Sequence, residues 1–285
     1  MTAIIRWDTE LTALSSIAHG GEQLGTISLL RREKVLLPDG QLLLVPIISG
    51  NSIRGVLRRI GEELMRAELA YDRRLSLSAA HALRGGGALA KCQGPALTGA
   101  RLATVRELIP LVGVFGTSAG GTIVDGCLQA GKVLPVVSEL VAQIPQQRGE
   151  PPRHSLYDLV QVENYTRQDD LDRHGFLDRC AAPEEEPTSE SRQMRFGVET
   201  LAAGTRLAGW MQLTWATPME ISFFSEVLQT FAARGRIGGR VAAGHGQISV
   251  TWHRQVLAGQ DQPVQWRAML SQRHTEALEA LTWLT

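Results

Sequence analysis

The segment 49–72, SGNSIRGVLRRIGEELMRAELAYD, carries the strongest structural pattern in the chain. Its apolar residues recur at i, i+3, i+4, i+7 and i+11, a spacing that places them on one face of an α-helix. These residues are Ile53, Val56, Leu57, Ile60 and Leu64. Ser49, Asn51 or Ser52 can cap the start of the helix with a side-chain oxygen. The pattern therefore predicts an amphipathic helix whose apolar face is buried.

Strands and a second helix complete the predicted core. The expected strands lie at 3–14, 34–37, 42–47, 121–137, 196–216 and 247–252, with turns at 38–40 and 202–204 and a loop over 15–26. The second helix is expected over 221–234, where apolar residues again share one face. The order strand–helix–strand, insertion, strand–helix–strand predicts an α+β, ferredoxin-like fold of the kind found in RRM domains.

Two stretches interrupt this core. Residues 71–110 mix helix-like segments with RGGG and QGP breaks, which predicts an insertion packed on the core. Residues 145–195 are mostly polar, charged and turn-rich, which predicts an exposed insertion. The tail, 263–284, is expected to form one more amphipathic helix. We expect a single domain over 1–285.

Composition limits the class of protein without deciding it. Lys+Arg and Asp+Glu both number 29, so the net charge is zero, which argues against a generic nucleic-acid-coating protein. The only lysines are Lys34, Lys91 and Lys132. Most of the basic residues are therefore arginines. Arginine forms planar, bidentate contacts with phosphate, which would suit RNA binding. A GC-rich coding bias explains the excess of arginine over lysine about equally well.

The cysteines and the apolar runs point to the cytoplasm. Cys92, Cys127 and Cys180 are odd in number and widely spaced, so they form neither a disulfide framework nor a zinc knuckle. Apolar runs fall short of the roughly 18 residues of a membrane span, and the start of the chain lacks the basic region of a signal peptide. We therefore expect a cytoplasmic protein with no membrane partner.

Two glycine-containing segments are candidate binding sites. In SGNSIRGVLRR, the helix start offers free backbone N–H groups and a positive dipole end, and Arg54 and Arg58 lie on one face away from the apolar stripe. This arrangement suits a phosphate backbone, although an ordinary capped surface helix explains it as well. In GRIGGRVAAGHG, 235–246, the glycines allow close approach of a ligand, and Arg236 and Arg240 are basic. A flexible connection between helix and strand is the alternative.

Five segments in order resemble the CRISPR-associated RAMP superfamily (repeat-associated mysterious proteins). GNSIRGVLRR is similar to its G-S-S-[LI]-[KR]-G-x-[LI]-R helix start, and GGRVAAGHGQI is similar to its late glycine-rich loop. The other three are VFGT at 114–117, VENYTRQDD at 162–170 and FGVETLAAGTRLAG at 196–209. The resemblance spans about residues 5–250. The single helix-start motif and the long insertion favour the subunit that forms the backbone of a multi-subunit effector complex.

The resemblance implies a specific function and specific residues. Several copies would assemble as a helical oligomer along one CRISPR RNA, within a ribonucleoprotein that serves antiviral and anti-plasmid defence. Other effector subunits would join, and the guide would pair with target nucleic acid. The implied RNA-binding residues are Asn51, Ser52, Arg54, Arg58, Gly239, Arg240, Gly244 and His245. A thumb hairpin within 165–195 would flip out bases, with Arg167, Met194 and Phe196 as candidates.

Catalysis finds less support in the sequence. Some backbone subunits of this superfamily cut target RNA with an aspartate in the loop after the first strand, but here that loop carries Glu22 and no aspartate. His19, His81 or His245 could act as a base in guide-RNA processing, yet none has a Tyr or Lys partner visible in the sequence. We therefore expect no enzyme activity, no metal and no cofactor. The alternatives are a RAMP-type endoribonuclease and a generic ferredoxin-like protein-interaction domain.

Overall fold

The fold was obtained as a computed structural model, which describes residues 2–87, 96–144, 151–167 and 194–284. Its main sheet is antiparallel and has the spatial order β13-β1-β12-β8, with β9 also paired to β12. The strands are β1 Ala3–Ala13, β8 Leu128–Ala130, β9 Leu134–Pro135, β12 Arg206–Ala216 and β13 Ile248–Gly259. Helices α1 Gly50–Leu69 and α6 Pro218–Arg234 connect them in the order β1-α1-β8-β12-α6-β13. This is the predicted α+β, ferredoxin-like arrangement, and we call these elements the palm.

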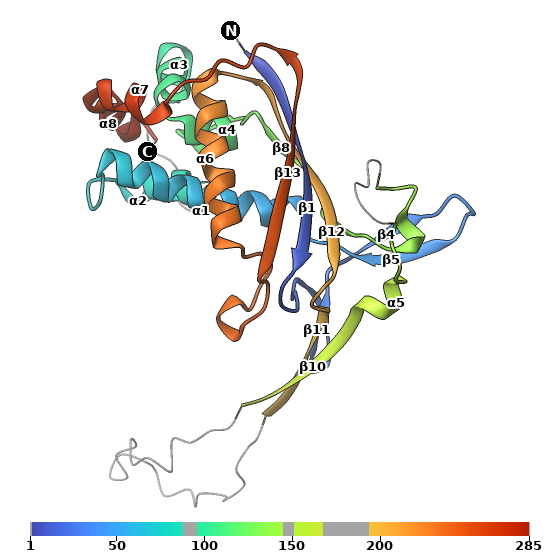
Figure 1. The fold of residues 1–285 in the computed structure, drawn as a ribbon. Coiled ribbons are helices and arrows are strands. Elements are labelled where there is room, and N and C mark those ends of the chain that lie inside the picture. Colours follow the sequence, from blue (N-terminus) through green and yellow to red (C-terminus); the bar gives the residue numbers. More distant parts are fainter. Residues whose placement is uncertain (1, 88–95, 145–150, 168–193, 285) are drawn as a thin grey trace, which may run out of the picture.

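The helices cover one face of the palm sheet (Figure 1). Along β1, alternate side chains are buried toward the helices, as the period of two in its sequence requires. Trp7 of β1 meets Phe224 of α6 edge-on, with ring centroids 5.3 Å apart. This apolar layer between sheet and helices forms the core.

Both predicted palm helices are confirmed. The Ser49 hydroxyl accepts a hydrogen bond from the Ser52 N–H at 3.3 Å and caps α1. Thr217 and Glu220 form a capping box, which starts α6 three residues before the predicted Ile221. The predicted apolar face of α6 is fully buried: Ile221, Phe224, Val227, Leu228 and Phe231.

The described part of the predicted first insertion is largely helical. It contains α2 Leu77–Gly85 and α3 Gly99–Leu108, and is followed by α4 Pro110–Phe115, β6 Thr117–Ala119 and β7 Thr122–Val124. The single helix predicted for the tail is wrong. The chain leaves helical geometry at Arg273, which separates α7 Trp266–Gln272 from α8 His274–Thr282. The break lets α8 pack against α3 and bury Ala277, Ala280 and Leu281.

A second sheet extends away from the palm (Figure 1). Its order is β10-β11-β3-β2, built from β2 Gly20–Leu24, β3 Ile27–Leu30, β10 Val160–Arg167 and β11 Met194–Leu201. The loop expected over 15–26 is therefore partly wrong, because β2 pairs with β3 there. The predicted 34–47 hairpin is confirmed as β4 Arg32–Leu36 and β5 Leu42–Pro46.

The predicted exposed insertion at 145–195 is more ordered than its composition indicated. It includes the short helix α5 Leu156–Leu159 and strand β10, which pairs antiparallel with β11 along its whole length. Residues 168–193 lie outside the described residues. The described part of the chain also contains two short 3₁₀ turns, η1 Ser138–Leu140 and η3 Val241–Ala243.

Candidate nucleic-acid interface

The start of α1 and the glycine-rich loop, residues 235–246, meet at the turn that follows β1. The Gly239 N–H donates to the Ala18 carbonyl at 2.6 Å. The next residue, His19, accepts a hydrogen bond on Nε2 from the Ser49 N–H at 3.3 Å. Three segments that are far apart in the sequence therefore converge at one helix start.

Two positions of the loop require glycine for different physical reasons. Gly238 has φ +80°, and a Cβ there would lie 2.6 Å from the Ala18 carbonyl oxygen. Gly244 also has positive φ, but open space surrounds it. Gly238 thus permits the close contact between loop and turn, whereas Gly244 permits only the turn itself.

The helix start is a suitable environment for an anion. The first turn of α1 contains no acidic residue, so its positive dipole end is not neutralised locally. Asn51 is exposed and Ser52 is half-buried. Arg31 is exposed, its N–H donates to the His19 carbonyl at 2.7 Å, and its charge is close to the imidazole. Burial first, and Arg31 second, lower the pKa of His19.

Arg58 and Arg54 do not form the exposed basic face that the sequence predicted. Arg58 is buried, and its guanidinium donates to four main-chain carbonyl oxygens. Arg54 is half-buried and donates to the carbonyls of Phe115 (3.0 Å) and Leu128. Burial lowers the pKa of Arg58 to about 10, so it remains cationic at neutral pH. The prediction fails because helical spacing shows only that these residues avoid the apolar stripe. The first insertion and the end of α4 cover Arg58, whereas the end of α4 and the start of β8 cover Arg54.

An aromatic and cationic cluster lies on β10 and β11 beside the glycine-rich loop. We define the aromatic cluster as Tyr165, Phe196, Arg240 and His245. The rings of Tyr165 and Phe196 are stacked, with centroids 5.6 Å apart and planes 18° apart. The exposed Arg240 lies over the Phe196 ring at 5.2 Å. The cluster therefore joins the glycine-rich loop to the second sheet.

His245 is the polar link within this cluster. It is 2% exposed, its Nδ1 lies 2.9 Å from the Ser16 hydroxyl, and its Nε2 lies 2.5 Å from the Tyr165 hydroxyl. The Tyr165 hydroxyl donates to Glu163 at 3.0 Å. Each imidazole nitrogen of His245 therefore lies within hydrogen-bond distance of a hydroxyl group, and its donor or acceptor role depends on the tautomer.

The tyrosine partner of His245 was missed in the sequence because 80 residues separate them. The burial of His245 also corrects its expected role, since the imidazole supports the loop from beneath and does not face solvent. Its network perturbs the neighbouring groups. Hydrogen bonds from Ser16, Thr200 and Tyr165 lower the pKa of Glu163. Partial burial and Glu163 raise the pKa of Tyr165.

The predicted thumb residues lie on neighbouring strands. Arg167 and Met194 are register partners at the last described pair of β10 and β11. Their side chains lie outside the described part of the structure. Phe196 is half-buried and packs against Tyr165 and Arg240, so its ring is partly covered.

The candidate catalytic residues are dispersed over the fold. Glu22 lies on β2 and is exposed, whereas His81 lies on α2. Among the described residues, no group of three His, Cys, Asp or Glu side chains is placed to hold a metal ion. The described helices also include none that is long and apolar enough to cross a membrane.

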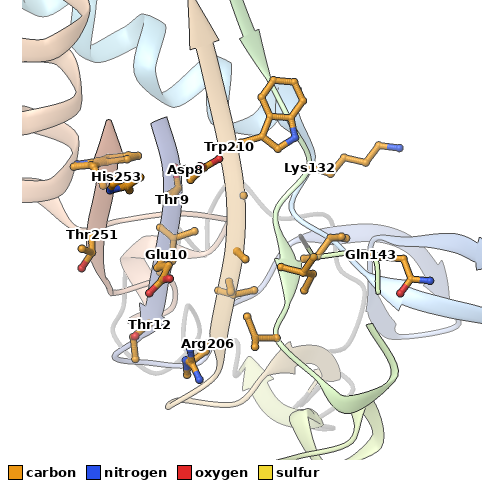
Figure 2. Close-up of a pocket in the computed structure, with 18 of the residues that line it drawn as sticks. Asp8, Thr9, Glu10, Thr12, Lys132, Gln143, Arg206, Trp210, Thr251 and His253 are labelled. Atoms are coloured by element: carbon orange, nitrogen blue, oxygen red, sulfur yellow. The ribbon is translucent and has the colours of Figure 1, made fainter. Parts of the chain in front are cut away.

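A separate cavity of about 430 Å³ opens on the face of the palm sheet that the helices leave bare (Figure 2). Residues of β1, β12 and β13 line it, including Asp8, Glu10, Trp210 and His253. Arg6 donates to Asp8 at 2.8 Å and lies over the Trp210 ring at 4.7 Å. Both signs of charge mix in this cavity, and the residues predicted to bind RNA lie elsewhere.

Comparisons with known proteins agree with this geometry. The family model described as "RAMP superfamily" matches residues 10–249. A chain of a solved structure titled "Type IV-B CRISPR Complex" is 35% identical, with a TM-score of 0.65. The alignment covers 92% of this chain and 96% of that chain. None of the curated proteins matches. Since the family model spans most of the sequence and the ferredoxin-like palm carries the expected motifs, the chain belongs to the RAMP superfamily.

Proposed function

We propose that this protein is a non-catalytic, CRISPR RNA-binding backbone subunit of a multi-subunit effector complex. Several copies would lie side by side along one guide RNA, together with other subunits, and leave the guide free to pair with target nucleic acid. The observation that carries the proposal is the convergence of the α1 start, the glycine-rich loop and the aromatic cluster into one surface.

Each part of this surface suits a different part of an RNA strand. The N–H groups at the α1 start, with Asn51, Ser52 and Arg31, are suited to phosphate oxygens. Arg240 can contact a phosphate from the open side of the loop. The partly exposed rings of Tyr165 and Phe196 offer an apolar face for an unstacked base. Such contacts read backbone and shape, so binding should be independent of guide sequence.

Arg54 and Arg58 take a supporting role in this proposal. Their guanidinium groups tie α1 to the carbonyls at the end of α4 and at the start of β8. They thereby hold the first half of α1 against the end of α4 and the start of β8. The positive charge that faces RNA comes instead from the exposed arginines around the loop.

A catalytic reading is less well supported by the same contacts. The His–Tyr pair that a ribonuclease could use is present as His245 and Tyr165, but the imidazole is 2% exposed and both its nitrogens have partners. A general base must reach the 2′-hydroxyl of its substrate. The buried imidazole therefore favours a structural role.

The test is to express the tagged chain in its native host, purify it gently, and sequence any RNA that accompanies it. Short repeat-flanked RNAs of uniform length in a high-mass particle would support the proposal. A nucleic-acid-free monomer would refute it. Arg240→Ala should reduce the recovered RNA, whereas Arg106→Ala on the distant helix α3 serves as a control with the same change in charge.

A further inference from the structure

A second cavity lies on the other side of the glycine-rich loop, between the loop, α1 and the end of α6. Its volume is about 430 Å³. Four arginines line it, Arg59, Arg84, Arg234 and Arg236, and Glu63 is the single acidic residue of the lining. Its remaining lining is largely apolar and includes Val56, Ile60 and Phe231. We call this cavity the arginine pocket.

The acidic groups neutralise only half of these arginines. Glu63 accepts from Arg234 at 2.7 Å and lies 3.9 Å from Arg84. Arg84 also bonds the neighbouring Glu62 at 2.6 Å. Arg59 and Arg236 are exposed and have no acidic partner among the residues that the structure describes. Two guanidinium groups therefore face the pocket without a counter-charge.

Fold stability alone does not explain all of these cations. Arg234 and Arg236 flank the C-terminus of α6, where a cation offsets the negative end of the helix dipole. Arg59 lies in the middle of α1 and has no such role. Arg59 is exposed on the face of α1 that lines the pocket, and Val241 of the glycine-rich loop also lines the pocket. The arrangement of Arg59 opposite Arg236 thus resembles a clamp for an anion.

We infer that the arginine pocket binds a backbone phosphate of the same RNA strand that the aromatic cluster contacts. The inference rests on the proposed function and deepens it. Exposed arginines stand on both sides of the glycine-rich loop, with Arg240 over Phe196 on one side and Arg59 with Arg236 on the other. A single strand that crosses the loop would meet both. Paired guanidinium groups are the side chains best suited to a phosphate dianion or diester.

The test measures the affinity of the purified full chain for a mixed-sequence single-stranded RNA over a range of salt concentrations. Each lost phosphate contact lowers the slope of log K against log salt by about 0.7 for a single strand. Arg59→Ala with Arg236→Ala removes the contact to one phosphate, so it should lower the slope by about 0.7 and weaken binding about 5-fold at 0.1 M salt. Glu63→Gln should act oppositely and strengthen binding, since it frees Arg234 from its ion pair while Arg84 keeps Glu62.

The matched control is Arg74→Ala with Arg106→Ala. Both residues are exposed and have no ion pair among the described residues, so the double variant loses the same net charge elsewhere. An equal loss in both double variants would mean a general charge effect and would overturn the inference. So would unchanged binding in Arg59→Ala with Arg236→Ala.

Two further arms separate the possible failures. If the wild type binds RNA and Arg240→Ala weakens binding, but the pocket variant does not, the proposed function survives and the pocket assignment is wrong. If the wild type does not bind RNA, both are wrong. Binding of inorganic phosphate alone, measured by ³¹P NMR, tests whether the pocket instead takes free phosphate. If the pocket variant lost phosphate binding but bound RNA as tightly as the wild type, the inference would also be overturned.

Discussion

Replacing Arg58 by alanine should destabilise the fold and not act primarily on RNA binding. Its guanidinium donates to the carbonyls of Phe115 and Gly116 at 2.6 Å each, and to those of Ala82 and Leu83 at 3.3 and 3.2 Å. The short pair contributes about 1.5 kcal/mol per bond, the low end for a charged donor, and the longer pair about 0.5 kcal/mol per bond. Arg58→Ala should therefore cost about 4 kcal/mol of unfolding free energy, because four hydrogen bonds from a charged donor to buried carbonyls are lost.

Urea unfolding followed by circular dichroism and by tryptophan fluorescence measures this loss. Arg59→Ala is the matched control on the next residue of α1, since Arg59 is exposed and should change stability by less than about 0.5 kcal/mol. If Arg58→Ala matched Arg59→Ala in stability, the buried hydrogen bonds would not exist as described. If Arg58→Ala kept full stability but lost RNA affinity, the phosphate-contact role predicted from the sequence would be restored.

Three other predictions concern the loop, a thiol and a carboxylate. Gly246→Ala should destabilise the protein by more than about 2 kcal/mol, because φ is +77° and the new Cβ would lie 1.9 Å from the Ile237 carbonyl oxygen. Gly244→Ala, in open space, should cost only about 1 kcal/mol, and equal losses in thermal unfolding would contradict this distinction. Burial raises the pKa of the Cys127 thiol to about 12, so iodoacetamide at pH 8 should label it only after denaturation. Peptide mass spectrometry measures the labelling, and rapid labelling of the folded protein would refute the assignment. Hydrogen bonds depress the pKa of Glu163 in the folded state, so its contribution to stability is complete above its ordinary value of 4.5 and is lost as pH falls through the lower, folded value. The difference in thermal midpoint between wild type and Glu163→Gln should thus be constant from pH 5.5 to 8 and shrink at lower pH, and a difference that grows on acidification would have the wrong sign.

Local pattern accounts for most of the fold. The stripes on α1 and α6, the alternation in β1 and the turn at 38–40 each depend on neighbours within a few residues, and the structure confirms them. The break at Arg273 depends on a distant partner, α3, which local pattern does not encode. The strand at 20–24 pairs with the adjacent β3, whose other partner is the distant β11.

In the candidate site, too, some features follow from local sequence and others depend on distant contacts. The glycine-rich loop and the start of α1 carry recognisable sequence signals, and they meet in space at Ala18 and His19. The role of an arginine depends on what covers it, which the sequence does not state. Arg58 and Arg59 are adjacent in the chain, yet one is buried under the first insertion and the other is exposed at the arginine pocket.

The cross-link between the glycine-rich loop and β10 has a consequence for how this protein can vary. Tyr165 and Phe196 belong to the projecting strands, whereas Arg240 and His245 belong to the palm, and the four side chains contact one another. Residues in direct contact have non-additive effects when they change. The projecting strands are therefore not an interchangeable module: a replacement taken from another protein would need its own matching loop. Substitutions in the glycine-rich loop and in β10 and β11 should therefore be correlated among related sequences.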